Sequence, residues 1–72
     1  MAAEEKNITY KRTGYDGRAK KYIVKSFRND VPLYEYRCKI NGNRATLYPY
    51  RRILATEVEM RSREISVFDL KR

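Results

Sequence analysis

The chain has no histidine, a single cysteine and no long run of apolar residues. Histidine and cysteine are the usual ligands of structural zinc, so a zinc site of ordinary ligand spacing is excluded. Cys38 has no partner for an internal disulfide, and we interpret it as a buried core residue of a cytoplasmic protein, in a reducing compartment. No stretch is apolar enough to span a bilayer or to form the core of a signal peptide, so we expect no membrane association.

The sequence motifs that bind nucleotide phosphates are also missing. Neither a GxxxxGKS/T loop nor a GxGxxG loop is present. Glu57 and Glu59 would point away from each other on a helix, so a carboxylate pair for acid–base catalysis is not expected. The one enzyme class that the composition leaves open is an endoribonuclease whose arginine, lysine and tyrosine side chains polarise phosphate. We predict a protein that is not an enzyme and has no cofactor.

Positive charge is plentiful and unevenly placed. The 72 residues make one domain with a small core. They carry 17 lysines and arginines against nine acidic residues, for a net charge of +8. Residues 6–52 alone balance to +10, whereas residues 53–72 balance to zero. Because this excess falls on the part of the chain with the strongest strand patterns, it indicates a basic sheet that binds a polyanion.

The strongest hairpin signal is Asn41-Gly42, because a type I′ turn needs positive φ at both central residues. A two-residue loop there pairs Ile40 with Asn43, and the alternation along both strands then divides the side chains between two faces. The apolar face holds Tyr34, Tyr36, Cys38, Ile40, Ala45 and Leu47. The polar face holds Glu35, Arg37, Lys39, Arg44, Thr46 and Tyr48.

A second hairpin is predicted upstream. Residues 21–27 are rich in β-branched and aromatic residues, and Asn29-Asp30 supplies a two-residue loop. This loop pairs Tyr22 with Arg37, which places the Tyr22 ring on the basic face. The two hairpins give a three-stranded antiparallel sheet with the Arg37 strand in the centre.

Residues 1–20 are interpreted as a flexible basic arm, and residues 21–72 as a single small domain. Residues 8–10 could begin a short strand, but Gly14 and Gly17 are expected to break it. In DNA-binding proteins such arms lie along phosphates or in a minor groove.

Residues 51–63 fit two structures, and the choice between them sets the fold class. Tyr50, Leu54 and Val58 recur at helical spacing, yet residues 54–60 also alternate as a half-buried strand would. The helix gives an α+β fold, a three-stranded antiparallel sheet packed against one C-terminal helix. The strand gives an all-β, five-stranded small barrel of the SH3 or OB kind. Either supplies the cover that the apolar face needs, and we favour the helix.

A family resemblance supports the helix. It rests on Tyr34-x-Tyr36-Arg37, Gly42, Leu47, Arg51-Arg52-Ile53 and Thr56-Glu57. These residues resemble the N-terminal arm-type DNA-binding domain of lambda-type tyrosine recombinases (integrases). The resemblance implies three strands packed on a C-terminal helix, with the sheet entering the major groove. Tyr48-Pro49 departs from the small, glycine-rich step of that family's third strand. The chain has no room for a recombinase catalytic domain and no histidine for one.

We therefore predict a small nucleic-acid-binding protein that binds double-stranded DNA through its basic sheet face. Arginine reads guanine edges by paired hydrogen bonds, and both lysine and arginine neutralise phosphates. The candidates for base reading are Arg37, Lys39, Arg44, Thr46, Tyr48 and Tyr22. The candidates for phosphate contacts are Lys20, Lys21, Lys25, Arg28, Arg51 and Arg52.

Two alternatives remain open at this point. RNA could replace DNA as the ligand, since no residue specifically reads the 2′-hydroxyl. The protein could instead be a basic protein-interaction factor of phage or plasmid type that inhibits or recruits a larger host complex. Exposed tyrosine and arginine side chains would then serve as interface anchors.

Overall fold

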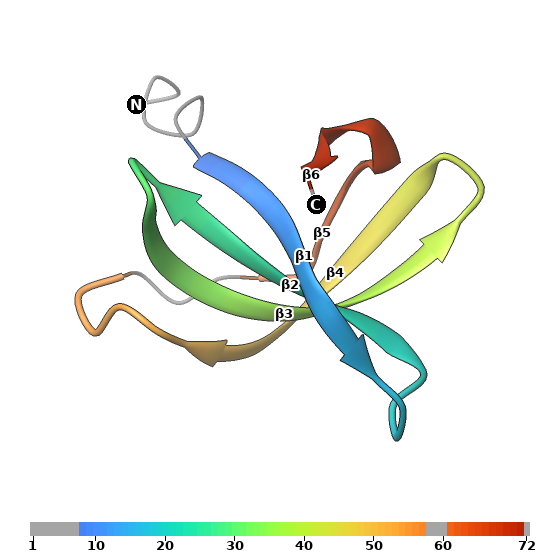
Figure 1. Cartoon of the computed structure of the whole chain (residues 1–72), viewed down its shortest axis with the longest axis horizontal. Coiled ribbons are helices and arrows are strands. Elements are labelled where there is room, and N and C mark those ends of the chain that lie inside the picture. The colour runs from blue at the N-terminus through green and yellow to red at the C-terminus, as the bar shows by residue number, and fades with distance from the viewer. Residues whose placement is uncertain (1–7, 58–60, 72) are drawn as a thin grey trace.

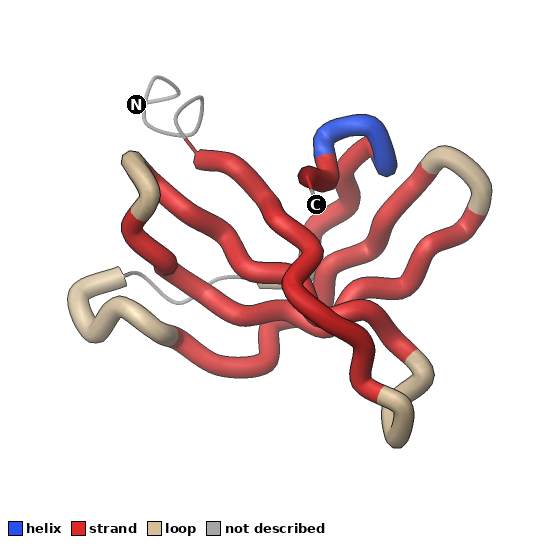
Figure 2. The backbone as a smooth tube through the Cα atoms, in the orientation of Figure 1, coloured by secondary structure: helices blue, strands red, loops and turns tan. Residues whose placement is uncertain are grey.

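The computed structural model describes residues 8–57 and 61–71, and these form one curled sheet (Figure 1). The strands are β1 (Ile8–Asp16), β2 (Lys21–Arg28), β3 (Val31–Asn41), β4 (Arg44–Arg52), β5 (Arg63–Ser66) and β6 (Leu70–Lys71). A short 3-10 helix, η1 (Val67–Asp69), joins the last two strands. The spatial order is β5-β4-β3-β2-β1-β6. Figure 2 shows that strand structure dominates the described chain.

The C-terminal segment brings the two edges of the sheet together. β5 pairs antiparallel with β4 at one edge, while β6 pairs parallel with β1 at the other. Only the three residues of η1 separate β5 from β6, so the sheet must curl until its edges lie a few residues apart. The Arg63 guanidinium in β5 also donates a 2.6 Å hydrogen bond to the Tyr10 hydroxyl in β1. The curled sheet thereby covers its own apolar face.

The predicted C-terminal helix is wrong, because the described part of residues 51–63 contains no α-helix. β4 continues through Arg52, and residues 53–57 then form bends and turns. The backbone N–H groups of Ile53 and Leu54 both donate to the Leu33 carbonyl, at 2.9 and 3.0 Å. Leu54 packs against the core from this turn. The fold matches the all-β small-barrel alternative, although residues 53–57 are not a strand and Val58 and Met60 lie outside the described residues.

The core fills the inner, concave side of the sheet. Its buried hydrophobic residues are Tyr10, Val24, Leu33, Tyr34, Tyr36, Cys38, Ala45 and Leu47. The predicted burial of Cys38 is confirmed. The Tyr36 ring lies at its centre, with ring contacts to Tyr10 and Tyr34. The predicted apolar face of the β3–β4 hairpin thus forms the inside of the molecule, except at Ile40, which is 36% exposed near the hairpin end.

Both central hairpins form, but their turns differ from the prediction. The β3–β4 loop is Gly42-Asn43, and it pairs Asn41 with Arg44. Positive φ occurs at Gly42 (63°) but not at Asn43, as a type II′ turn requires. Ile40 therefore pairs with Ala45 rather than with the predicted Asn43. Because this shift is two residues, every side chain of the hairpin keeps its predicted face. The I′ geometry belongs to the β2–β3 turn, where Asn29 and Asp30 have φ of 52° and 67°.

The register of β2 against β3 corrects the placement of Tyr22. The turn pairs Arg28 with Val31 as predicted, but an irregularity between Ser26 and Phe27 shifts the remaining pairs by one residue. Tyr22 therefore pairs with Cys38 rather than Arg37. Because side chains alternate between faces, a one-residue shift moves the side chains of residues 22–26 to the opposite face from the predicted one. Tyr22 joins the inner side, not the basic face.

β1 extends through the glycine-containing stretch that we expected to break it. Residues 8–16, which we assigned to the arm, pair with β2 along their whole length. A bulge between Arg12 and Gly14 accommodates the extra residue Thr13. Residues 1–7 lie outside the described part of the chain.

Candidate nucleic-acid interface

The convex side of the sheet carries most of the predicted site residues, and we call it the outer face. It includes the side chains of Lys11 and Asp16 from β1; Lys21, Ile23 and Lys25 from β2; Glu35, Arg37 and Lys39 from β3; Arg44, Thr46, Tyr48, Tyr50 and Arg51 from β4; and Glu64 from β5. Strand alternation keeps them apart from the core. Eight of the predicted site residues lie on this face.

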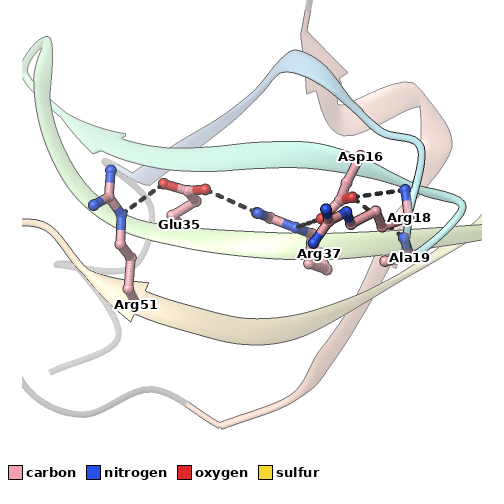
Figure 3. Close-up of polar contacts among 6 residues, drawn as sticks. All are labelled: Asp16, Arg18, Ala19, Glu35, Arg37 and Arg51. Atoms are coloured by element: carbon pink, nitrogen blue, oxygen red, sulfur yellow. Dashed lines mark hydrogen bonds and ion pairs between the residues drawn. The ribbon is translucent and has the colours of Figure 1, made fainter.

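A chain of ion pairs crosses the middle of the outer face (Figure 3). Glu35 accepts from Arg51 Nε at 2.9 Å and from Arg37 Nη1 at 2.8 Å. Arg37 Nε also donates to Asp16 Oδ2 at 2.9 Å. The other Asp16 oxygen accepts the backbone N–H groups of Arg18 and Ala19 in the β1–β2 turn. This chain ties β1, β3 and β4 together on the side away from the core.

These contacts stabilise the charged forms of all three central groups. Burial of the Glu35 carboxyl raises its pKa, but hydrogen bonds from Arg37 and Arg51 outweigh burial and bring the pKa below its ordinary value. The hydrogen bond from Arg37 is the main cause of the lowered pKa of Asp16. Burial lowers the pKa of Arg37, yet its bonds to Glu35 and Asp16 raise it overall. The network is therefore ionised near neutral pH.

Arg37 was one of the candidates for base reading, but its guanidinium binds other side chains of the protein. Its side chain is only 13% exposed and binds two carboxylates. Its guanidinium carbon also lies 3.7 Å from the centroid of the Tyr50 ring. A guanidinium held in this way is not presented edge-on to a base pair, so Arg37 supports the surface rather than protruding from it.

The lysines of the outer face differ from its arginines in their ion pairs. In the part of the chain that the structure describes, no lysine forms an ion pair. Lys25 pairs with Glu35 in register, yet the Glu35 carboxylate turns to the two arginines. Lys21 Nζ lies 5.6 Å from the centroid of the Tyr48 ring. The outer face therefore retains uncompensated positive charge at Lys11, Lys21, Lys25 and Lys39.

Three further candidates lie on β4. Arg44 forms a 2.8 Å ion pair with Glu64, but its side chain is 69% exposed, where such a pair is weak. Thr46 pairs with Lys39, and Tyr48 pairs with Arg37. Tyr48 is 40% exposed, so its ring is accessible beside the lysines.

The remaining predicted residues lie away from the outer face. Arg28 and Arg52 converge on Glu57 at the end of the sheet, through a 3.6 Å ion pair and a 3.0 Å bond to the Glu57 carbonyl. Lys20 lies in the β1–β2 turn with φ of 57°. On the inner side, the Tyr22 ring packs against the core and beneath the Arg12 guanidinium.

The sequence interpretation missed Tyr50, Asp16 and the structural role of Glu35. Tyr50 was assigned to a helical pattern, whereas it occupies a bulge in β4 between Pro49 and Arg51. Proline in a strand is typical of such a bulge, and Tyr48-Pro49-Tyr50 was the signal that could have located it. Asp16 is 21 residues from Arg37, so their contact has no signature in the sequence.

No protein-family model, curated protein or solved structure matches the chain. The described residues contain no cluster of acidic or cysteine side chains that could hold a metal ion. Within the same residues, no helix has the length and apolar character needed to cross a membrane.

Proposed function

We propose that the protein binds nucleic acid through the outer face and acts as a binding module rather than an enzyme. One observation carries this proposal: the carboxylates in the middle of the face are bound to arginines, and its four lysines have no ion pair within the described residues. Lysines spaced over a convex surface suit phosphate groups, which supply most of the affinity in nonspecific binding.

Because the Arg37 guanidinium is bound by two carboxylates, the proposed contacts differ from those expected from the sequence. Base-pair reading by Arg37 from within a major groove is no longer part of the proposal, because Nε and Nη1 bind carboxylates and the side chain is only 13% exposed. The proposed contacts are to the sugar–phosphate backbone. Lys39, Arg44, Thr46 and Tyr48 remain the exposed or half-exposed side chains that can touch a base.

Salt dependence tests the proposal quantitatively. Four lysine–phosphate contacts predict that log affinity falls with log salt at a slope of about −3.6 for duplex DNA and about −2.8 for single strands. Fluorescence anisotropy with labelled duplex DNA, single-stranded DNA and RNA over a salt series measures the affinity and its slope against log salt for each nucleic acid.

A pair of variants locates the contact surface. We expect Lys39→Ala to lower affinity for every sequence and to reduce the magnitude of the salt slope by about 1. Arg61→Ala removes the same charge outside the six strands and should leave the slope unchanged. Equal effects of the two variants would mean that net charge alone drives binding. Absence of binding to all three nucleic acids at low salt would contradict the proposal and favour a protein partner.

A further inference from the structure

The most exposed aromatic ring of the outer face rests on a rigid support. Tyr50 is 58% exposed, and one side of its ring contacts the Arg37 guanidinium at 3.7 Å from the centroid. More than half of the Tyr50 surface is therefore open to solvent beside this contact. Figure 3 shows that Arg37 is itself held between Asp16 and Glu35, through bonds of 2.9 and 2.8 Å. The Tyr50 ring therefore packs on a cation that is itself held by two carboxylates.

Such an arrangement contributes little to stability. Exposed rings bury little apolar surface, and a cation–π contact at an exposed site is weak. A pre-positioned ring does, however, bind a flat ligand without losing side-chain freedom. Base–aromatic stacking is tolerant of sequence, and a cation behind the ring adds to it.

The neighbouring side chains indicate what the flat ligand is attached to. Tyr48 lies two residues before Tyr50 on β4. Lys21 and Lys39 are neighbours of Tyr48 on the outer face, from β2 and β3. Arg51 follows Tyr50 and is 65% exposed on the same face despite its ion pair. Positive charge on both sides of a stacking ring complements a base that carries phosphates on either side.

The spacing of the two rings favours an unpaired strand. Two residues span about 6.6 Å along a regular strand, and Tyr48 and Tyr50 lie on either side of Pro49 where the bulge of β4 begins. Bases in a duplex follow one another at about 3.4 Å along each strand and cover one another's faces. Only bases separated from their neighbours can each meet one ring.

We propose that Tyr50, supported by Arg37, is a stacking platform for an unpaired nucleobase, with Tyr48 as its neighbour, so that the ligand is single-stranded nucleic acid. This inference rests on the proposed function and specifies its ligand. Arg37 acts here as a positioning residue, and Tyr50 makes the contact.

The test compares oligonucleotides that share a backbone but differ in their bases. Labelled oligothymidylate, the corresponding abasic oligonucleotide, oligouridylate and a duplex of the same length are titrated with the full chain by anisotropy. We expect the single strands to bind at least about 10-fold more tightly than the abasic oligonucleotide, because the abasic strand loses every stacked base. Equal binding of the thymidine and uridine strands is expected, because stacking does not involve the 2′-hydroxyl.

Matched variants assign the stacking to one ring. Tyr50→Ala should lower affinity for oligothymidylate about 10-fold and leave abasic binding unchanged, while Tyr50→Phe should retain wild-type affinity. Tyr15→Ala is the control, since Tyr15 is similarly exposed (56%) but lies on the opposite side of the sheet. Thermal unfolding verifies that each variant is folded, and the abasic comparison on the wild-type chain stands without any variant.

The outcomes separate this inference from the proposed function. Equal affinity of the wild-type chain for thymidine and abasic strands overturns the stacking platform but leaves phosphate binding intact. Tighter binding of the duplex than of either single strand overturns it as well. Absence of binding to every oligonucleotide at low salt overturns both.

Discussion

Glu35 is an acidic side chain on a basic face, and its surroundings explain why it is tolerated there. Its side chain is 8% exposed and receives hydrogen bonds from two arginines. Removing a carboxylate from such a site leaves donors unpaired and costs more than the pair itself contributes. Glu35 therefore organises Arg37 and Arg51, and through Arg37 it affects the position of Tyr50.

We predict that Glu35→Gln lowers the free energy of unfolding at neutral pH by about 2 kcal/mol, the typical value of hydrogen bonds to a charged group. The pKa of Glu35 lies below its usual 4.5 in the folded protein. Its stabilisation is therefore complete above about pH 4.5 and is lost as the pH falls through the folded value. Urea unfolding at several pH values should show wild type and variant converging in acid. A constant difference down to low pH would contradict this role.

Tyr36 presents the opposite case, a polar atom in the core. The side chain is fully buried, and its hydroxyl makes no well-formed hydrogen bond among the described residues, although the Ser26 side chain lies near it and slightly opposes the rise of its pKa. Burial raises the pKa of the phenol. We predict that Tyr36→Phe raises the free energy of unfolding by about 1 kcal/mol, because an unsatisfied buried group is removed while the ring contacts stay. Tyr10→Phe, which loses the bond from Arg63, should destabilise instead, and denaturant unfolding compares the two.

At the scale of elements, the two tight turns set the pairing of β2, β3 and β4. Asn29 and Asp30 both have positive φ, which favours glycine at the second position, whereas only Gly42 has positive φ in the next turn. We predict that Asp30→Gly stabilises the protein and Gly42→Ala destabilises it, each by about 1 kcal/mol. Thermal unfolding measures both changes. Destabilisation by Asp30→Gly would show that the Asp30 side chain contributes more than backbone strain costs.

The bulges are the second feature at this scale. One between Ser26 and Phe27 shifts β2 against β3, and one at Tyr50 shifts the end of β4. The first decides that Tyr22 faces inward. The second brings Tyr50 over Arg37 and places Arg51 opposite Glu35. The candidate interface therefore depends on these two irregularities.

At the scale of the molecule, residues 63–71 decide whether the sheet can cover its own core. Ile65 and Leu70 pack against the core from β5 and β6, at the two edges. Without β5 and β6, the core residues beside β1 and β4 are exposed to solvent. A sheet of this size with an uncovered apolar face is only marginally stable.

We predict that a chain ending at Ser62 loses its cooperative unfolding transition and its dispersed amide NMR spectrum. The control is Phe68→Ser within the same segment. That ring is 82% exposed, so its removal should leave stability within about 0.5 kcal/mol of wild type. A truncated chain that unfolds cooperatively would show that β1–β4 suffice for the fold.

The sequence by itself determined which side chains of residues 34–48 face the core and which face outward. That division is local, because alternation has a period of two and survives a pairing that is shifted by two residues. Tertiary structure decided the rest: the inward side of Tyr22, the capture of Arg37 by Asp16, and the closure of the sheet by β5 and β6 in place of a helix. These outcomes depend on bulges and on contacts between residues far apart in the chain, such as Arg63 with Tyr10. Their free energies arise only when distant segments meet, so no local pattern records them.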